Sequence, residues 1–470
     1  MLAVQMARSD GSWVDDVLLA GPDHEVCLWL GRPVERRLLR ELVAERGRGL
    51  AHAGLRPGGT VALKLPPSLA YVVSLLSAWR AGGQVVLLDY RLTEHETSRA
   101  LAHLAPQLLV TAGQTADGPL SGYYEVAETT SALADGRPAA TDHALVQLSS
   151  GSTGPSKIIG RTAPSLIDEL DRYERIEGMP QRGESAVVAN SLSHTFGLIG
   201  VLLYNLHVGA RTVVPPRLTP LDILDVVAAS SEFVTLFGVP FHYELLAGVS
   251  SPPPLPQLAR AVSGGELVRP ELPVAFVSRY GIPLGQCFGM TEVGVIAMDA
   301  LAEYPGVGRP APGVGVQLEG DELLVGMDHT PYIGASDPSR WHDGWLHTRD
   351  AASIDSATGS VLLRGRLDSQ VAIGGMKVDL NEVEHTLTAL PGVVEAAVVF
   401  DSSIEAFVSL AEDVTPAAVE EALAVQLAPF KRPRQLHVVA QLPRTVTGKR
   451  LRDLNALRAA ASSLATAARS

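Results

Sequence analysis

The stretch of sequence that decides the fold is Leu148-Ser149-Ser150-Gly151-Ser152-Thr153-Gly154-Pro155-Ser156-Lys157. Small and hydroxyl-bearing residues fill most of this stretch, and a single cation ends it. The glycines permit tight backbone turns, the hydroxyl and backbone N–H groups donate hydrogen bonds, and Lys157 supplies positive charge. These groups suit a polyphosphate, so the stretch predicts a phosphate-binding loop.

A flexible Ser/Gly linker and a Walker A loop are the alternatives for this stretch. A linker is disfavoured because the apolar run Ala144–Leu148, directly before the loop, is typical of a buried strand. A Walker A loop is excluded because it requires Gly-x-x-x-x-Gly-Lys-Ser/Thr, whereas Lys157 stands three places after Gly154. The sequence therefore predicts a phosphate loop of another type.

Strand-like and helix-like patterns alternate on both sides of this loop. We expect strands at 60–65, 84–89, 108–110, 144–148, 186–189 and 211–214, and helices at 33–54, 69–80 and 198–208. This alternation predicts βαβ units and mostly parallel sheets. Ligands of such sheets bind beyond the ends of the strands, which is where the loop follows its strand.

The pattern changes twice toward the C-terminus. After Gly306, short strands separated by Gly, Pro and Asp predict a β-rich subdomain. From Leu380 onward, helices expected at 380–389 and 416–427 and strands expected at 393–400 and 406–410 predict a compact α+β unit. The expected fold class is therefore α/β, with a large N-terminal domain and a small α+β C-terminal domain.

Composition narrows the class of protein. The 470 residues are 46% hydrophobic and 19% charged, as in globular proteins. The formal net charge of −13 argues against nucleic acid as a partner. Only Cys27 and Cys287 are present, so we expect no disulfide framework and a cytoplasmic location. No apolar segment suits a signal peptide or a membrane span, so no membrane partner is expected.

Four later motifs are weak when taken singly, but they occur in a fixed order after the loop. They are Phe288-Gly289-Met290-Thr291-Glu292, Gly344-Trp345-Leu346-His347-Thr348-Arg349-Asp350, Gly365-Arg366-Leu367-Asp368 and Pro443-Arg444-Thr445-Val446-Thr447-Gly448-Lys449. Together with the loop, this set resembles the adenylate-forming superfamily of acyl-CoA synthetases, aryl-acid ligases, peptide-synthetase adenylation domains and luciferases. The resemblance implies activation of a small carboxylic acid by ATP as acyl-AMP, with release of pyrophosphate, and then transfer to a thiol.

The resemblance also implies a role for each motif residue. It implies that the β- and γ-phosphates are bound by Ser150, Ser152, Thr153 and Lys157. It implies that adenine is framed by Gly264, Gly265 and Glu266 and stacks on the ring of Phe288. It implies that ribose is bound near Asp350 and Arg366. It implies that Thr291 contacts the α-phosphate, that Glu292 is a Mg²⁺ ligand, and that Lys449 is the catalytic lysine. Asp368 matches the hinge of a mobile C-terminal domain, which divides the chain into domains 1–367 and 368–470.

The chemistry of such a reaction agrees with these roles. The first step joins two anions and needs cations where charge develops, here Mg²⁺ and Lys449; losing one such group typically costs on the order of 10²–10³ in rate. A general base is not required, because a carboxylate substrate is already ionised near pH 7. His194 is therefore not assigned the role of a base.

The sequence also departs from the family pattern. Pro155 comes one place early in the phosphate loop, and Ile158 replaces a final glycine. Arg349 stands where a glycine is usual in the ribose motif, and Ala372 stands where many relatives carry lysine.

The segment Ser191–Leu198 resembles the one that opens the acyl pocket in the family. No acidic residue lies between Glu184 and Asp222 to pair with an ammonium group, and burying an unpaired ammonium is costly. We therefore expect an aryl or fatty acid in preference to an α-amino acid. The expected pocket walls are His194, Phe196, Phe237, Gly238, Val239, Phe241 and Met290, with a structural role as the alternative for His194, Phe237 and Phe241.

The expected acceptor is the thiol of CoA or of the phosphopantetheine arm of an acyl or peptidyl carrier protein. In relatives, the loop at Gly374-Gly375 approaches the pantetheine channel, and the run Lys431-Arg432-Pro433-Arg434 offers a contact for CoA or a carrier, or else a structural turn. An amide-forming ligase with an amine acceptor, or a non-catalytic nucleotide- or acyl-binding relative, is the alternative. A Rossmann dehydrogenase is disfavoured because Pro310 falls where its helix would begin.

Overall fold

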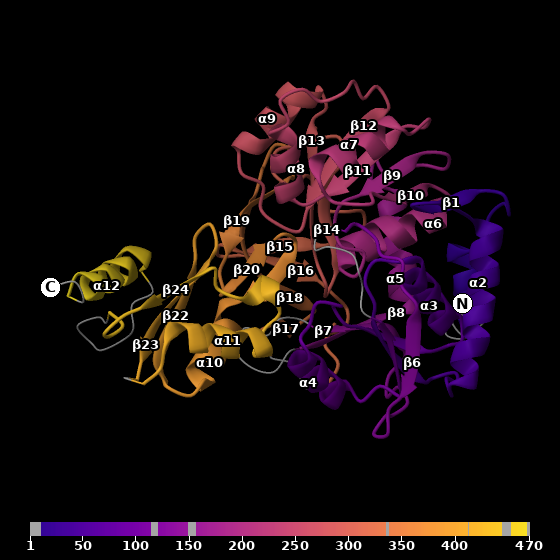
Figure 1. The fold of residues 1–470 in the computed structure, drawn as a ribbon. Coiled ribbons are helices and arrows are strands. Elements are labelled where there is room, and N and C mark those ends of the chain that lie inside the picture. The colour runs from indigo at the N-terminus through magenta and orange to yellow at the C-terminus, as the bar shows by residue number, and fades with distance from the viewer. Residues whose placement is uncertain are drawn as a thin grey trace. The chain divides into compact units, whose positions relative to one another are not determined.

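The computed structural model describes residues 11–113, 121–148, 157–334, 338–411, 413–443 and 453–467. Of the predicted site residues, Ser150, Ser152, Thr153 and Lys449 lie outside these ranges. The chain divides into two compact units (Figure 1). The first unit comprises Met1–Tyr90, Ala105–Ser149 and Lys157–Leu367, and the second comprises Arg91–Leu104, Ser150–Ser156 and Asp368–Ser470.

The first unit contains an eight-stranded sheet in the order β14-β13-β12-β11-β9-β10-β1-β2. Its strands are β1 (Val26–Leu30), β2 (Pro33–Glu35), β9 (Ser185–Val188), β10 (Arg211–Val214), β11 (Val234–Gly238), β12 (Leu258–Gly264), β13 (Leu284–Met290) and β14 (Gly294–Asp299). The pairs from β1 through β13 are parallel, and only the edge pairs β13–β14 and β1–β2 are antiparallel. The carboxyl ends of β12 and β13 therefore lie side by side.

A six-stranded sheet in the order β6-β5-β3-β4-β7-β8 completes the α/β part of this unit. Its strands are β3 (Thr60–Lys64), β4 (Gln84–Leu87), β5 (Leu108–Ala112), β6 (Glu128–Ala132), β7 (His143–Leu148) and β8 (Ile158–Thr162). The helices of the unit are η1 (Val14–Leu18), α2 (Arg36–His52), α3 (Leu69–Arg80), α5 (Ala163–Glu174), η2 (Phe196–Leu203), α6 (Tyr204–Val208), α7 (Pro220–Ala228), α8 (Pro240–Ala247) and α9 (Glu271–Tyr280).

Helix α3 illustrates how the sequence specifies an element. The Ser68 hydroxyl accepts a hydrogen bond from the Tyr71 N–H (3.0 Å) and caps the N-terminus, and Gly82, with φ +70°, follows the C-terminus. The helix is apolar on nearly all sides, which suits an element that is buried between neighbours. It packs against α2, beside which it lies in Figure 1. Trp79 reaches across the core to Trp13, with ring centroids 5.2 Å apart.

The β-rich subdomain is an antiparallel sheet of β15 (Val316–Glu319), β16 (Glu322–Gly326), β17 (Trp341–His342), β18 (Trp345–Ile354) and β19 (Val361–Arg366). The pairing of β16 with β18 is irregular between Glu322 and Leu324. Since this irregularity faces Arg349 and Asp350, it bears on the site described below.

The second unit has its own apolar core. Its elements are α4 (Glu94–Leu104), β20 (Gln370–Ile373), β21 (Met376–Asp379), α10 (Leu380–Ala389), β22 (Val393–Phe400), β23 (Ile404–Leu410), α11 (Pro416–Gln426), η3 (Pro429–Lys431), β24 (Gln435–Val438) and α12 (Leu454–Ala467). Helix α4 packs against α11 within this unit.

The predicted α/β class with a β-rich subdomain and a C-terminal α+β part is confirmed, and helix 69–80 was predicted with the observed bounds. The prediction that Pro33 opens a helix is wrong. Pro33 lies in β2, and the helix begins at Arg36. Because β2 is an edge strand, the N–H that proline lacks removes no hydrogen bond from inside the sheet. The apolar run predicted as a helix over 198–208 is π-helical from Phe196 to Leu203 and α-helical after it.

Candidate active site

The predicted adenine segments meet because β12 and β13 are parallel neighbours, with Gly264 in register with Cys287. Gly265, directly after β12, has φ +86°, a conformation that favours glycine. A β-carbon on Gly264 would lie 2.7 Å from ring carbon Cε1 of Phe196, so only glycine lets the Phe196 ring pack at the end of this strand. Phe288, from β13, is half-buried nearby in the sheet. The fold thus brings a predicted adenine residue against a predicted acyl-pocket residue.

Glu292 lies in the tight connection between β13 and β14, and its side chain is buried. The Tyr332 hydroxyl donates a hydrogen bond to Glu292 Oε1 at 3.2 Å. Burial, together with the negative charge of Glu292, raises the pKa of Tyr332 above its ordinary value. The phenol therefore stays protonated and donates its hydrogen bond to the carboxylate.

Lys157 is drawn to the same place by backbone pairing. Ile159 forms a bridge with Tyr332, and the Ile333 N–H donates to the Ile158 carbonyl at 2.8 Å. The ammonium group of Lys157 consequently lies over the Tyr332 ring, 5.5 Å from its centroid. Tyr332 links the predicted phosphate lysine to the predicted metal ligand.

Glu292 supplies one carboxylate that could act as a Mg²⁺ ligand. Mg²⁺ is usually held by one or two carboxylates together with water and substrate phosphate oxygens. Among the described residues, the group of three acidic or histidine side chains that could converge on one ion is Asp171, Glu174 and His207, which does not include Glu292. An ion at Glu292 would therefore take its other ligands from phosphate and water.

Asp350 and Arg366 are in register on the antiparallel strands β18 and β19. Arg366 Nη1 donates to Asp350 Oδ2 at 2.9 Å and to the Thr348 carbonyl at 3.1 Å. Asp350 is buried except for a small part of its surface, so the arginine offsets the cost of burying its charge. Arg349, at the position where relatives usually carry glycine, has φ +62°.

The segment predicted to open the acyl pocket follows β9. His194 Nε2 lies 3.6 Å from Asp89 Oδ2, and Asp89 follows β4 of the other sheet. The Gln147 side-chain amide donates a hydrogen bond to the Ser193 carbonyl and accepts one from the Thr195 hydroxyl, both at 3.4 Å. Although the sequence has no acidic residue between Glu184 and Asp222, an acid from far earlier in the chain therefore lies beside His194.

The remaining predicted pocket walls differ in exposure. Phe237, Val239 and Met290 are buried, and the Phe237 ring meets Phe196 edge-on, with centroids 5.9 Å apart. Gly238 is buried at the end of β11, next to the Tyr243 and His242 side chains. Phe241, by contrast, is 48% exposed on α8 and meets the His242 ring edge-on. Thr291 and Glu266 are half-buried after the ends of β13 and β12.

The comparisons with known proteins agree with these motifs. The model of the AMP-binding enzyme family matches residues 17–329, and that of the AMP-binding enzyme C-terminal domain matches residues 382–449. The chain is an AMP-binding enzyme. The prediction of an adenylate-forming, carboxylic-acid-activating ligase is thereby confirmed.

Several relatives of this AMP-binding enzyme are named as acid–CoA ligases. Feruloyl-CoA synthase of an Amycolatopsis species is 30% identical, over 88% of this chain and 91% of its own length. The 4-hydroxybenzoate–CoA/benzoate–CoA ligase of Rhodopseudomonas palustris is 28% identical, over 88% of this chain and 87% of its own. The fold is similar to that of a double mutant of o-succinylbenzoate CoA synthetase from Bacillus subtilis, with a TM-score of 0.80 and 21% identity, over 95% of this chain and 98% of the other.

The basic run Lys431–Arg434 of the second unit has two interpretations from sequence, a contact for CoA or a carrier and a structural turn, and its contacts favour the second. Lys431 is buried, and its ammonium group lies 3.0 Å from a carboxylate oxygen of Glu382 and of Glu96. Burial opposes the charge, but the two carboxylates outweigh it and raise the pKa of Lys431. Arg432 donates to the carbonyls of Leu427 and Ala424. Of the cations in this run only Arg434 is exposed, so the run as a whole is a structural turn.

Gly374 and Gly375 form the two-residue turn between β20 and β21, with φ +57° and +80°. Two positive φ angles in succession are typical of the hairpin turn that favours glycine at both places. No helix among the described residues is long and apolar enough to cross a membrane.

Proposed function

We propose that this AMP-binding enzyme activates an aromatic carboxylic acid with ATP and Mg²⁺ and then transfers the acyl group to the thiol of CoA. In the first half-reaction, a carboxylate oxygen of the acid attacks the α-phosphorus of ATP. The bond from that phosphorus to the bridging oxygen breaks, and pyrophosphate leaves with the electron pair. No proton moves in this step. The product is an acyl-AMP mixed anhydride.

The observation that carries the proposal is the convergence of Lys157, Tyr332 and Glu292. A buried carboxylate that accepts a hydrogen bond from a phenol suits Mg²⁺, and the lysine over the same phenol ring suits the phosphates. Bound Mg²⁺ would neutralise charge that develops on the phosphate oxygens. In the proposal Thr291 donates to the α-phosphate, and Ser150, Ser152 and Thr153 donate to the β- and γ-phosphates.

The pair Asp350–Arg366 supports the nucleoside part of the proposal. A carboxylate held at 2.9 Å by an arginine is fixed in orientation, as an acceptor for two ribose hydroxyls must be. Phe288 and the strand-end segment Gly264–Glu266 would enclose the adenine, which the turn at Gly265 leaves room to approach.

The class of carboxylic acid is inferred from the side chains at the predicted acyl pocket. The Phe196 and Phe237 rings form an edge-to-face pair, which suits a further aromatic ring. His194 and Asp89 add a polar pair 3.6 Å apart, which suits a hydroxyl or amino substituent on that ring. Relatives named as feruloyl-CoA and benzoate–CoA ligases support the aromatic class.

The second half-reaction belongs to the proposal as well. The CoA thiolate attacks the acyl carbonyl, AMP leaves, and the thiol proton passes to solvent. Lys449 is the proposed cation of adenylation, and Asp368, at the boundary of the second unit, is the proposed hinge between the two half-reactions. A phosphopantetheinyl carrier protein is the alternative thiol donor.

The test is pyrophosphate release by the purified protein with ATP and Mg²⁺. The acids are benzoic, cinnamic, hydroxylated and amino-substituted aromatic acids, short- and long-chain fatty acids, and the amino acids, each with and without CoA. We expect a burst with aromatic acids alone and turnover with CoA. A burst that only a carrier protein or an amine converts to turnover would replace the acceptor. Silence with every acid, or a preference for α-amino acids, would overturn the proposal.

A pair of variants provides the control for this assay. Glu292→Gln should lose pyrophosphate release by about 10²–10³-fold, since it removes the charge offered to the metal. The exposed Glu303→Gln, on the same unit, should leave release unchanged. Equal losses in both would point to general damage and not to Glu292.

A further inference from the structure

The backbone directly before Asp350 is held in an unusual conformation. Arg349 has φ +62°, in the left-handed region that residues with a β-carbon rarely adopt. Such a conformation persists only where the surrounding structure enforces it. The site therefore requires an account of what holds Arg349.

Glu322, on β16, accepts two of the hydrogen bonds that restrain Arg349. Its Oε1 accepts a hydrogen bond from the Arg349 backbone N–H at 2.8 Å, and its Oε2 accepts one from Arg349 Nη1 at 3.4 Å. The other end of the guanidinium donates to the Ser339 carbonyl at 2.9 Å. The Arg349 carbonyl accepts from the Leu367 N–H at 2.8 Å. The backbone N–H and carbonyl of Arg349 and both terminal nitrogens of its guanidinium are thus held by hydrogen bonds.

The pairing of β16 with β18 explains why a side chain performs this task. Glu322 is in register with Ala351 but Leu324 with His347, so the strands slip past one another between these positions. The Glu322 carboxylate accepts the backbone N–H that the interrupted ladder leaves over. Glu322 is itself buried, and His347 Nδ1 lies 3.1 Å from its Oε2.

The turn at Arg349 sets the direction of the next side chain. In an extended strand, successive side chains point to opposite faces, so a change of φ at Arg349 would swing Asp350 away from its partner Arg366. In the observed conformation Asp350 Oδ2 meets Arg366 Nη1, and the Asp350 N–H meets the Thr348 hydroxyl at 3.0 Å.

We infer that Glu322 is a positioning residue that sets the ribose selectivity of the enzyme by holding Arg349, and through it Asp350. The inference deepens the proposed function and rests on it, because it takes Asp350 as the acceptor of the ribose hydroxyls. Glu322 touches no substrate in this account; it acts through the backbone.

The test compares ATP with 2′-deoxy-ATP in the pyrophosphate assay, with the best acid of the panel. Wild-type enzyme should prefer ATP by roughly tenfold or more in kcat/KM, as expected when an ionised acceptor loses a hydroxyl partner. Glu322→Gln should raise KM for ATP by about tenfold and leave KM for 2′-deoxy-ATP nearly unchanged, so the preference collapses. A merely structural role would weaken both nucleotides equally, and that result would overturn the inference.

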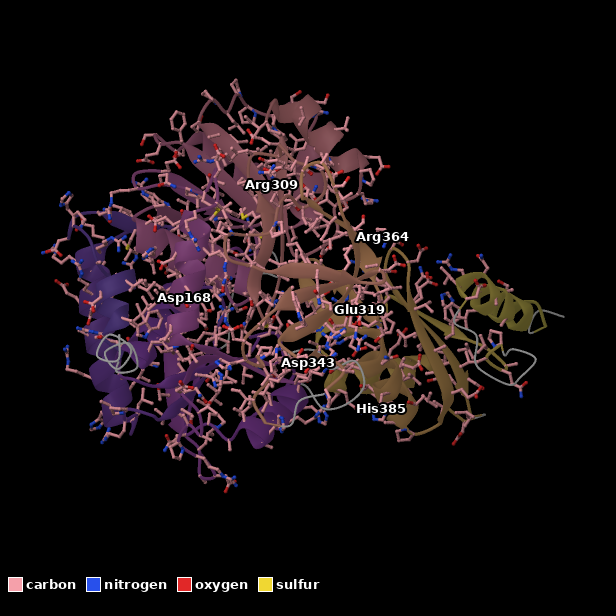
Figure 2. The ribbon with its side chains drawn as sticks, turned by 180° about the vertical axis from the view of Figure 1, so that it is seen from behind. Asp168, Arg309, Glu319, Asp343, Arg364 and His385 are labelled. Atoms are coloured by element: carbon pink, nitrogen blue, oxygen red, sulfur yellow. The ribbon has the colours of Figure 1, made fainter. Side chains whose placement is uncertain are left out.

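The matched control is Glu319→Gln. Glu319, labelled in Figure 2, is exposed and lies 3.9 Å from His347 Nδ1. The substitution removes a charge close to the same histidine. Since Glu319 forms no hydrogen bond or ion pair with Arg349, the preference for ATP should be unchanged. A collapse in this control would assign the effect to His347 and overturn the role of Glu322.

Substitutions at Arg349 keep the inference falsifiable if Glu322→Gln does not fold. Arg349→Gly should keep the preference for ATP and should restore it in the Glu322→Gln background, since glycine adopts φ +62° at little cost. Arg349→Val should lose the preference, since a β-branched residue resists that conformation. The opposite order would overturn the inference.

Failure of the proposed function gives a different result. Wild-type protein that releases no pyrophosphate with any acid overturns that function. Calorimetric dissociation constants of AMP and 2′-deoxy-AMP then carry the test, and the same ratio in wild type and Glu322→Gln would overturn the inference.

Discussion

Replacing Glu169 by leucine is expected to lower the free energy of unfolding of the first unit by about 4 kcal/mol, within the range measured for breaking a buried ion pair on one side. Glu169, on α5, is 0% exposed, and its Oε2 lies 2.7 Å from Nη2 of Arg161, which is 7% exposed and lies on β8. Its Oε1 accepts the Val295 N–H at 3.1 Å.

The size of the effect follows from what the substitution leaves behind. Arg161 would keep its bonds to the Ser165 hydroxyl and carbonyl, at 3.2 and 3.1 Å, but its buried charge would lose its carboxylate. The Val295 N–H would lose its acceptor, which alone costs about 1–3 kcal/mol. The two losses share one group and are not additive, so we place the total near the middle of the range for the ion pair.

The assay is urea unfolding followed by tryptophan fluorescence, because Trp13 and Trp79 lie together in the core of this unit. Arg161→Leu/Glu169→Leu should recover most of the loss, since apolar side chains can replace a buried pair. An exposed pair provides the comparison: Arg364 Nη2 lies 2.6 Å from Asp321 Oδ1, the side chains are 51% and 75% exposed, and Asp321→Asn should cost less than about 1 kcal/mol. A loss below about 1 kcal/mol for Glu169→Leu would refute the reasoning.

Three further predictions follow from the site and from the second unit. Tyr332→Phe should reduce pyrophosphate release by about two- to tenfold, because it removes one hydrogen bond to a carboxylate that remains in place. A loss as large as that of Glu292→Gln would mean that the phenol contacts substrate. Asp368→Pro should preserve acyl-AMP formation and abolish acyl transfer to CoA, whereas equal loss of both half-reactions would exclude Asp368 as the hinge. Burial lowers the pKa of His242 from 6.5 to about 4, so the unfolded state binds the extra proton; stability should fall as the pH falls from 6.5 toward 4, and His242→Gln should flatten this dependence in urea titrations.

Local signals predicted the elements whose partners lie close in the chain. Helix α3 was predicted from an apolar run that Gly82 closes, and the Ser68 cap seen in the structure is a further local signal. The ATP-site motifs were recognisable by their residue types and their fixed order, and some of their positions are restricted by backbone shape, as Gly265 is. Their roles in binding stay predictions, and they are testable with the variants above.

Contacts between distant segments were not predictable in the same way. Tyr332 lies in a segment without a motif and reaches Glu292 only because the residues around it pair with β8. Asp89 reaches His194 only because the two sheets meet in one unit. A sequence pattern carries periodicity and turn chemistry, but it does not say which strand ends will become neighbours. The burial of Lys431 was missed for the same reason.

Helix α4 has a consequence for protein engineering. It is encoded between β4 and β5 of the first unit, yet its Glu96 is buried against Lys431 in the second. A chimera spliced after Leu367 would bring a foreign partner to this native helix, and a truncation there would expose Glu96, Thr97 and Ala100 to water. Recombination between relatives therefore has to exchange 91–104 along with 368–470 if the transplanted module is to keep its ion pair.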